Sequence, residues 1–189
     1  SVDNWYVENI KNTGYSKYLS DEIFCNDRTA YTDEAGTASG DGYGEMQTYY
    51  GGYVRLVNIK KTPSFKCTQE NDMFTLKDEA SSEVRRGSIE GNKALDYPIG
   101  LITADEISAA GGVYGKNNTR YYLYKTRNYF SLSLSPYCSV IGAYVFRIEK
   151  NSSFNARFVL HTDGSASPVI NIAPKYSKNL QGTGTIDNP

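Results

Sequence analysis

The sequence has little of the material that metal, redox and nucleic-acid sites require. Its 189 residues include one histidine and three cysteines, too few for a Cys2His2 zinc finger, a three-histidine zinc site or an iron–sulfur cluster held by four thiolates. Lysine and arginine number 20 against 21 for aspartate and glutamate, so the net charge of −1 lacks the positive surplus of nucleic-acid-binding proteins. We therefore expect no cofactor, no zinc or iron site and no nucleic-acid partner.

Long apolar runs are also missing. A membrane-spanning helix needs ~20 apolar residues, whereas the longest apolar stretch, Val140 to Phe146, is short and contains a glycine. The composition is rich in Tyr, Asn, Ser, Thr and Gly and poor in Met and His, which is typical of exported bacterial surface domains. We therefore expect an extracellular, cell-surface domain that reaches a membrane only through an N-terminal segment outside this sequence.

Three cysteines allow at most one disulfide and leave one thiol over. Cys25 and Cys67 lie in polar, turn-rich surroundings, whereas Cys138 precedes an apolar strand. In an exported domain we expect Cys25 to pair with Cys67, closing a loop of about forty residues and stabilising the fold by ~3–4 kcal/mol. The alternative is three reduced, buried cysteines that pack as small apolar side chains.

Helical patterns lie in the first half of the chain and strand patterns in the second. Residues 3–14 show helical spacing, and 15–24 favour a second short helix with Tyr15, Tyr18 and Leu19 on one side. Residues 26–52 are rich in Gly, Thr, Asp and Ser and predict a long surface loop. Strands are predicted over 53–59, 73–76, 97–102, 120–124, 129–134, 140–149, 154–160 and 168–172.

The clearest local signal is a capping box at the start of a helix. The Thr103 hydroxyl can accept from the Glu106 amide while the Glu106 carboxylate reaches back to Thr103, and Gly111 ends the segment. We predict a structural function for Thr103 and Glu106, because the helix dipole already favours acids at this place. Helices followed by a strand meander predict one α+β domain over residues 1–189.

The strongest functional signal is aromatic. Tyrosines crowd the predicted sheet of the second half, interleaved with arginine and asparagine, and such mixtures are typical of adaptable binding surfaces. The alternative is that alternate rings fill the core. The residues predicted to bind a ligand are Tyr121, Tyr122, Tyr124, Arg127, Asn128, Tyr129 and Tyr137.

Polar residues elsewhere carry weaker signals. For Asn26, Asp27 and Arg28 we predict a structural network in which Asp27 pairs with an arginine and Asn26 holds a turn. Acids between Asp27 and Glu45 offer oxygen ligands for calcium, but their spacing fits no EF-hand and solvated loop acids are the favoured interpretation. The sequence leaves calcium binding open.

Three stretches resemble a family of bacterial domains found in exported surface and prepilin-like proteins. They are DNWY with FCNDR over 3–6 and 24–28, YPIGLITADEISAAGG over 97–112, and the strand-rich 133–172 with the closing GTGTIDNP. The order of elements is similar to the C-type-lectin-like fold of the formylglycine-generating-enzyme group. The resemblance implies a C-type-lectin-like domain, the C-terminal ectodomain of a longer exported protein, whose later sheet faces the ligand.

The chain departs from that pattern in three places, one of which is the absence of a tryptophan ahead of the Ser-Pro turn. Ser167 stands where an arginine precedes the final Pro-Val strand, and Cys138 has no second cysteine nearby for the oxidase chemistry of that group. We expect a non-enzymatic adhesion domain that recognises a glycan or a protein. The alternatives are a pilin-like or surface assembly subunit and, third, a hydrolase using the loop carboxylates.

Overall fold

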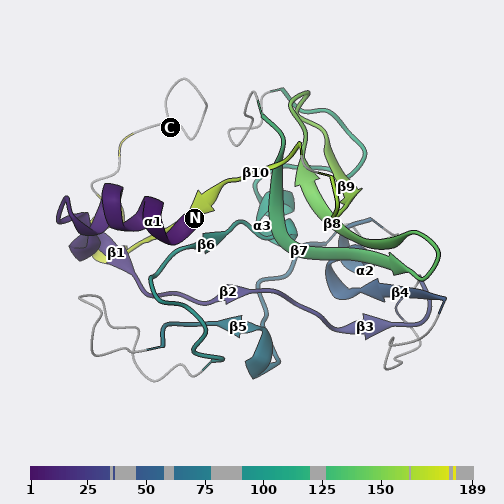
Figure 1. Ribbon diagram of the computed structural model, residues 1–189, viewed down its shortest axis with the longest axis horizontal. Coiled ribbons are helices and arrows are strands. Elements are labelled where there is room, and N and C mark those ends of the chain that lie inside the picture. Colours follow the sequence, from purple (N-terminus) through teal and green to yellow (C-terminus); the bar gives the residue numbers. More distant parts are fainter. Residues whose placement is uncertain are drawn as a thin grey trace.

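The computed structural model describes residues 1–34, 36, 46–57, 62–77, 91–119, 127–161, 163–178 and 181, and over these the chain is a mixed α+β protein (Figure 1). The α-helices are α1 (Val2–Tyr6), α2 (Gly51–Leu56), α3 (Ala104–Ala109) and α4 (Pro174–Ser177). A π-helical turn (Val7–Lys11) continues α1, and single 3-10 turns cover Tyr15–Tyr18 and Glu70–Asp72. The described strands are β1 (Leu19–Ser20), β2 (Phe24–Cys25), β3 (Ala30–Tyr31), β4 (Gln47–Tyr50), β5 (Met73–Phe74), β6 (Gly100–Leu101), β7 (Tyr129–Cys138), β8 (Gly142–Ile148), β9 (Phe154–Phe158), β10 (Ser165–Ala166), β11 (Pro168–Val169) and β12 (Asn171–Ile172).

The largest sheet has six strands. Antiparallel neighbours follow the order β3–β4–β7–β8–β9, and β10 pairs in parallel with β7. Strands β7, β8 and β9 follow one another along the chain and match the strands predicted near 129–134, 140–149 and 154–160. The predicted strand 120–124 lies outside the described residues.

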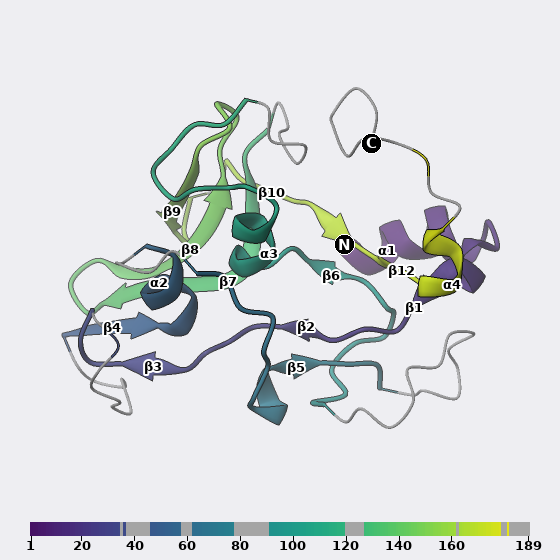
Figure 2. The ribbon, with the colours of Figure 1, turned by 180° about the vertical axis from the view of Figure 1, so that it is seen from behind.

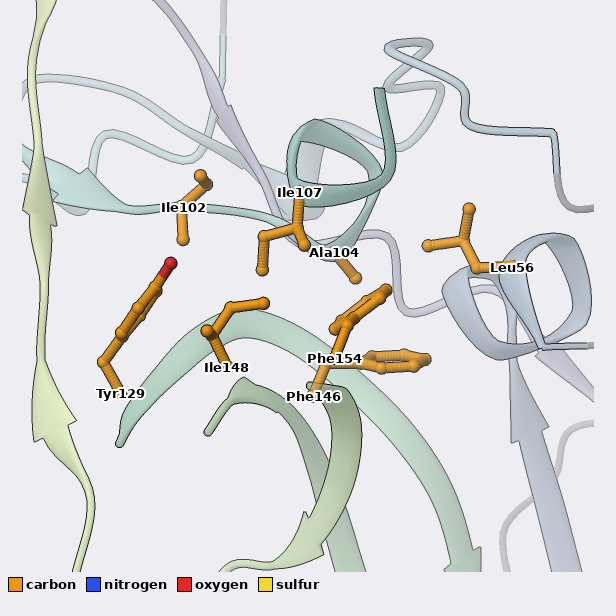
Figure 3. Packing of buried hydrophobic residues seen from close by; sticks show 8 residues of the cluster. All are labelled: Leu56, Ile102, Ala104, Ile107, Tyr129, Phe146, Ile148 and Phe154. Atoms are coloured by element: carbon orange, nitrogen blue, oxygen red, sulfur yellow. The ribbon is translucent and has the colours of Figure 1, made fainter. Parts of the chain in front are cut away.

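Helices α2 and α3 cover one face of this sheet. The main hydrophobic core lies between these helices and the sheet (Figure 3). Alternate residues of β7 are buried, and three of them are serines. Ser133 accepts a hydrogen bond from the Ala104 amide at 2.9 Å, so a small polar side chain lets the start of α3 approach the strand. The core residues are Leu56, Ile102, Ala104, Ile107, Tyr129, Phe146, Ile148 and Phe154.

The strand predicted over 53–59 is wrong, because residues 51–56 form helix α2. Val54 and Val57 favour a strand locally, but a helical turn places Tyr53, Leu56 and Val57 together against the main core. Burial of this apolar face outweighs the local preference of the β-branched side chains.

The first predicted helix is confirmed in part. Its N-cap is Ser1, whose hydroxyl accepts from the Asn4 amide at 3.2 Å, and Gly14 ends the segment with a φ of 73°. The second predicted helix, over 15–24, ends at Tyr18 instead. The reason is tertiary pairing, since Leu19 and Ser20 form β1 opposite Ile172 and Asn171.

The last predicted strand, 168–172, is split between two small sheets. β11 pairs with β6, and β12 pairs with β1. Of the predicted strand 97–102, all of which is described, only β6 takes part in a ladder. Elements from both ends of the described chain therefore meet. α1, β1, β12 and α4 gather at one end of the molecule, away from β3, β4 and β9 (Figures 1 and 2).

A second apolar cluster lies at this end. Tyr6, Ile10, Leu19 and Ile99 are buried there, and Tyr6 stacks on Tyr97 with ring centroids 5.0 Å apart. Elsewhere β2 pairs with β5, and Cys25 of β2 forms the predicted disulfide with Cys67. Cys138 is a free thiol. No helix in the described ranges is long and apolar enough for a membrane span.

Candidate binding site

An open apolar pocket lies at the end where α1, β1, β12 and α4 meet (Figure 2). It is a pocket of ≈ 390 Å³, within the ~300–1,000 Å³ that small-ligand sites occupy. We call it the tyrosine pocket, and its lining residues are Ile10, Tyr15, Tyr18, Leu19, Ile170, Ile172 and Tyr176.

Three aromatic rings form the wall of the tyrosine pocket. Tyr18 meets Tyr176 edge to face with centroids 4.9 Å apart, and Tyr15 lies 6.4 Å from Tyr18. Tyr15 and Tyr18 remain 55% and 38% exposed, so their surfaces are open to a ligand. Rings that pack on one another keep their orientation and lose little entropy on binding.

Backbone pairing brings these rings together from distant parts of the sequence. The Ala173 amide donates to the Tyr18 carbonyl at 2.9 Å, directly after the β1–β12 ladder. Ala173 is also the N-cap of α4, which begins at Pro174 and carries Tyr176. Proline suits the first helical position because its fixed φ matches the helix. The buried cluster of Ile10 and Leu19 forms the floor beneath.

Two lysines lie beside the aromatic wall. The Lys17 ammonium is 5.1 Å from the centroid of Tyr18, and the Lys175 ammonium is 4.8 Å from that of Tyr176. Both side chains are exposed, and within the described residues neither belongs to an ion pair. The pocket therefore combines an apolar interior with positive charge at its edge.

A second, smaller pocket of ≈ 90 Å³ is polar and lies beside the disulfide. Arg55 of α2 contacts two carboxylates there, Asp27 at 2.5 Å and Asp105 of α3 at 2.7 Å. Asp105 also accepts from the Ser64 amide at 2.8 Å. Gly51 makes room, since a Cβ on it would lie 2.5 Å from the Asp27 carboxylate.

The electrostatics of this second pocket favour ion pairing over catalysis. Burial alone would raise the pKa of Asp27, but hydrogen bonds from Thr29 and Arg55 outweigh it, so the pKa lies below its ordinary value. The two carboxylates correspondingly raise the pKa of Arg55, against the effect of burial. A general acid at neutral pH needs a raised carboxyl pKa. Asp27 thus acts as the predicted arginine partner, with Arg55.

The other predicted structural residues are placed as follows. Arg28 donates to the Asp72 carboxylate from its backbone amide at 2.9 Å and from Nε at 2.5 Å. These two bonds fix the start of the segment predicted as a loop over 26–52. The capping box is confirmed, with Glu106 accepting from the Thr103 amide at 2.7 Å and Thr103 accepting from the Glu106 amide at 3.1 Å. Asn26 differs from expectation. Its buried side-chain Oδ1 accepts no hydrogen bond within the described residues, and its backbone amide donates to the Asp72 carbonyl.

The predicted binding face is not assembled by the described residues. Tyr129 is 2% exposed, and its ring points into the main core toward Ile102 and Ile148 (Figure 3). The prediction that Tyr129 binds a ligand is therefore wrong, and this tyrosine is a core residue. Alternation along β7 turns it inward. Tyr137 is half-buried at the other end of β7, and Arg127 is exposed before the strand begins. Tyr121, Tyr122 and Tyr124 lie outside the described residues.

Asn128 is engaged internally. Its amide nitrogen donates to Asp163 at 2.8 Å, and its amide oxygen accepts from the Lys150 backbone at 2.8 Å. Asp163 in turn accepts from the buried Arg147, which also pairs with Glu149. Asn128 therefore joins the β8–β9 turn to the segment before β10, and the structure shows a structural function for its side chain.

The predicted calcium ligands are dispersed where they are described. Asp27 is held by Arg55, whereas Glu34 lies beside the Tyr53 hydroxyl at 3.3 Å. Asp41 and Glu45 lie outside the described residues. Within the described part, no cluster of three or more His, Cys, Asp or Glu side chains could hold a metal ion.

Sequence reasoning missed the tyrosine pocket although one of its signals was visible. The spacing of Tyr15, Tyr18 and Leu19 indicates one shared side, which we assigned to helix packing. Their partner Tyr176 lies more than 150 residues along the chain, and only the β1–β12 pairing reveals the contact. Searches against protein-family models, curated proteins and solved structures find no match for this chain.

Proposed function

We propose that this chain is a non-enzymatic, extracellular binding domain of a bacterial surface or pilus-associated protein, which recognises a glycan or protein through the tyrosine pocket. The observation that carries the proposal is the open pocket of ≈ 390 Å³ with three tyrosines in its lining. At recognition sites a few residues supply most of the binding energy, and tyrosine is enriched among them. The predicted face over 120–137 does not carry this proposal, because Tyr129 of that face is buried and Tyr121, Tyr122 and Tyr124 lie outside the described residues.

We further propose that residues 1–189 form a single domain with a C-type-lectin-like fold. Two observations support it: the capped helix α3 precedes the β7–β8–β9 meander, and β1 near the start pairs with β12 near the end. The disulfide supports an extracellular location, because such bonds persist in oxidising compartments.

The binding proposal is tested with Tyr18→Ala and Tyr176→Ala on a glycan array and a peptide array. The unaltered protein should bind at least one probe, and each variant should weaken that binding about tenfold or more. Tyr137→Ala is the matched control, since this half-buried ring belongs to the main sheet. Binding that survives both pocket substitutions, or fails only in the control, contradicts the proposal.

One observation favours the second candidate, a pilin-like or surface assembly subunit. The β7–β8 hairpin tip exposes Val140 and Ile141, and Met46 and Leu160 are exposed beside the strands that flank it. Apolar groups gathered at one end of a sheet mark interaction surfaces. Sedimentation at rising protein concentration, with and without Val140→Asp, measures whether this end drives self-association.

A further inference from the structure

The lining of the tyrosine pocket discriminates between the two ligand classes proposed above. Four of its residues are isoleucine or leucine, and the three tyrosines contribute hydroxyl groups as their only side-chain polar atoms. A sugar ring entering the pocket would give up water at several hydroxyls with few replacements, and each unpaired polar group buried in this way costs free energy. An apolar or aromatic side chain loses no hydrogen bonds on entry. The interior therefore favours an anchor side chain of a peptide.

The rim discriminates by charge. Each rim lysine lies next to a tyrosine of the pocket lining. The Lys17 ammonium is 5.1 Å from the Tyr18 ring centroid, and the Lys175 ammonium is 4.8 Å from the Tyr176 ring centroid. Lys11 belongs to the same end and lies 5.2 Å from the Tyr97 centroid. The acids nearest to Lys17 in sequence are Asp21, which is buried, and Glu22, which accepts a hydrogen bond from Ser20. The two rim lysines thus present positive charge that no acid of the described residues neutralises through an ion pair.

We propose that the tyrosine pocket takes one apolar or aromatic side chain of an acidic peptide segment, whose flanking carboxylates are met by Lys17 and Lys175. The inference rests on the proposed binding function and narrows its ligand class. The anchor supplies affinity by burial against the rings and isoleucines, and the lysines select the charge of the residues on either side of it.

The size of the charge effect follows from the exposure of both lysines. An exposed ion pair contributes little in water, so reversing both charges should weaken an acidic peptide about tenfold and no more than about a hundredfold. The same interaction should weaken as salt rises, because screening shortens the reach of exposed charges. Anchor burial should be insensitive to salt by comparison.

Isothermal titration calorimetry with synthetic peptides tests the inference. The probe is a short peptide with a central phenylalanine flanked by glutamates, compared with the same peptide flanked by glutamines or by lysines. The acidic peptide should bind most tightly, and the double variant K17E/K175E should lose about tenfold. K116E, a charge reversal at an exposed lysine outside the pocket lining, should bind like the unaltered protein.

The pocket itself is checked with Tyr18→Phe and Tyr18→Ala, with circular dichroism to confirm folding. The phenylalanine variant keeps the ring and should retain binding, whereas the alanine variant should lose it. Equal affinity for the acidic and glutamine-flanked peptides, or no effect of K17E/K175E, overturns the inference while leaving a peptide-binding pocket. Glycan binding that depends on Tyr18, with no peptide binding, overturns the inference but preserves the proposed function. No binding of either probe class overturns both.

Discussion

Arg55 links three parts of the chain through one side chain. It contacts Asp27, before β3, and Asp105, in α3, while its own backbone belongs to α2. Its side chain is 25% exposed and that of Asp105 is 8% exposed, so both charges are largely removed from water. Removing the arginine would leave two carboxylates near each other without their shared cation, which is far more costly than losing a solvated pair.

We therefore predict that Arg55→Met lowers the free energy of unfolding by about 2–4 kcal/mol. Urea denaturation followed by circular dichroism measures the change. Lys77→Met is the matched control, because the Lys77–Asp96 pair is exposed on both sides and its loss should leave the free energy of unfolding almost unchanged. Similar losses for the two variants would contradict a structural function for Arg55.

The same ion pairs make stability depend on acid. The pKa of Asp27 is lowered in the folded state, because the hydrogen bonds from Thr29 and Arg55 outweigh burial. Its contribution is therefore complete above the unfolded pKa of about 4 and is lost as pH falls through the lower folded pKa. In Asp27→Asn, stability should be reduced at neutral pH, and the deficit should shrink as the pH falls below about 4. Urea titrations at several pH values measure this, and a constant deficit would contradict it.

At the scale of elements, the capping box connects a local sequence signal to the site geometry. Thr103 and Glu106 satisfy the first amides of α3, and that helix carries Asp105 toward Arg55. We predict that Thr103→Ala costs about 1 kcal/mol of unfolding free energy. Thr103→Ser should recover most of it, because the hydroxyl that accepts the Glu106 amide is restored. An equal loss in the serine variant would indicate that the methyl group, and not the cap, stabilises this segment.

Elements differed in how much the sequence alone could predict. The capping box and strands β7 to β9 were predictable, since each depends on contacts within a short stretch or on a sustained alternation. Helix α2 was not, because Val54 and the C-cap Val57 favour a strand and only packing of Leu56 on the main core selects the helix. The two-residue strand β1 was not either, because its pattern is too short to be recognised without its partner, and β12 was predicted only as the end of a longer strand over 168–172 whose pairing with β1 the sequence does not indicate. The tyrosine pocket depends on that pairing and was missed for the same reason.

At the scale of the whole molecule, two apolar clusters share the chain and one disulfide lies outside both. The clusters contain different buried residues, one around α2, α3 and the large sheet and the other around α1 and β1. Cys25 and Cys67 belong to neither cluster. Their bond joins positions 42 residues apart in sequence, and the segment between them contains β3, β4 and α2. The bond therefore constrains the half of the molecule that holds the Arg55 ion pairs.

We predict that the double substitution Cys25→Ser with Cys67→Ser lowers the free energy of unfolding by about 4 kcal/mol, because the unfolded chain regains the entropy of a loop of this length. Cys138→Ser is the matched control and should leave stability within about 1 kcal/mol, since this thiol forms no bond. Below the melting transition, the double variant should bind a tyrosine-pocket ligand as the unaltered protein does, because the pocket lining includes neither cysteine. Denaturation in urea and calorimetric titration measure the two quantities separately. Loss of binding in the folded double variant would mean that the disulfide holds the pocket in shape, and an unchanged unfolding free energy would mean that the crosslink restricts the unfolded chain very little.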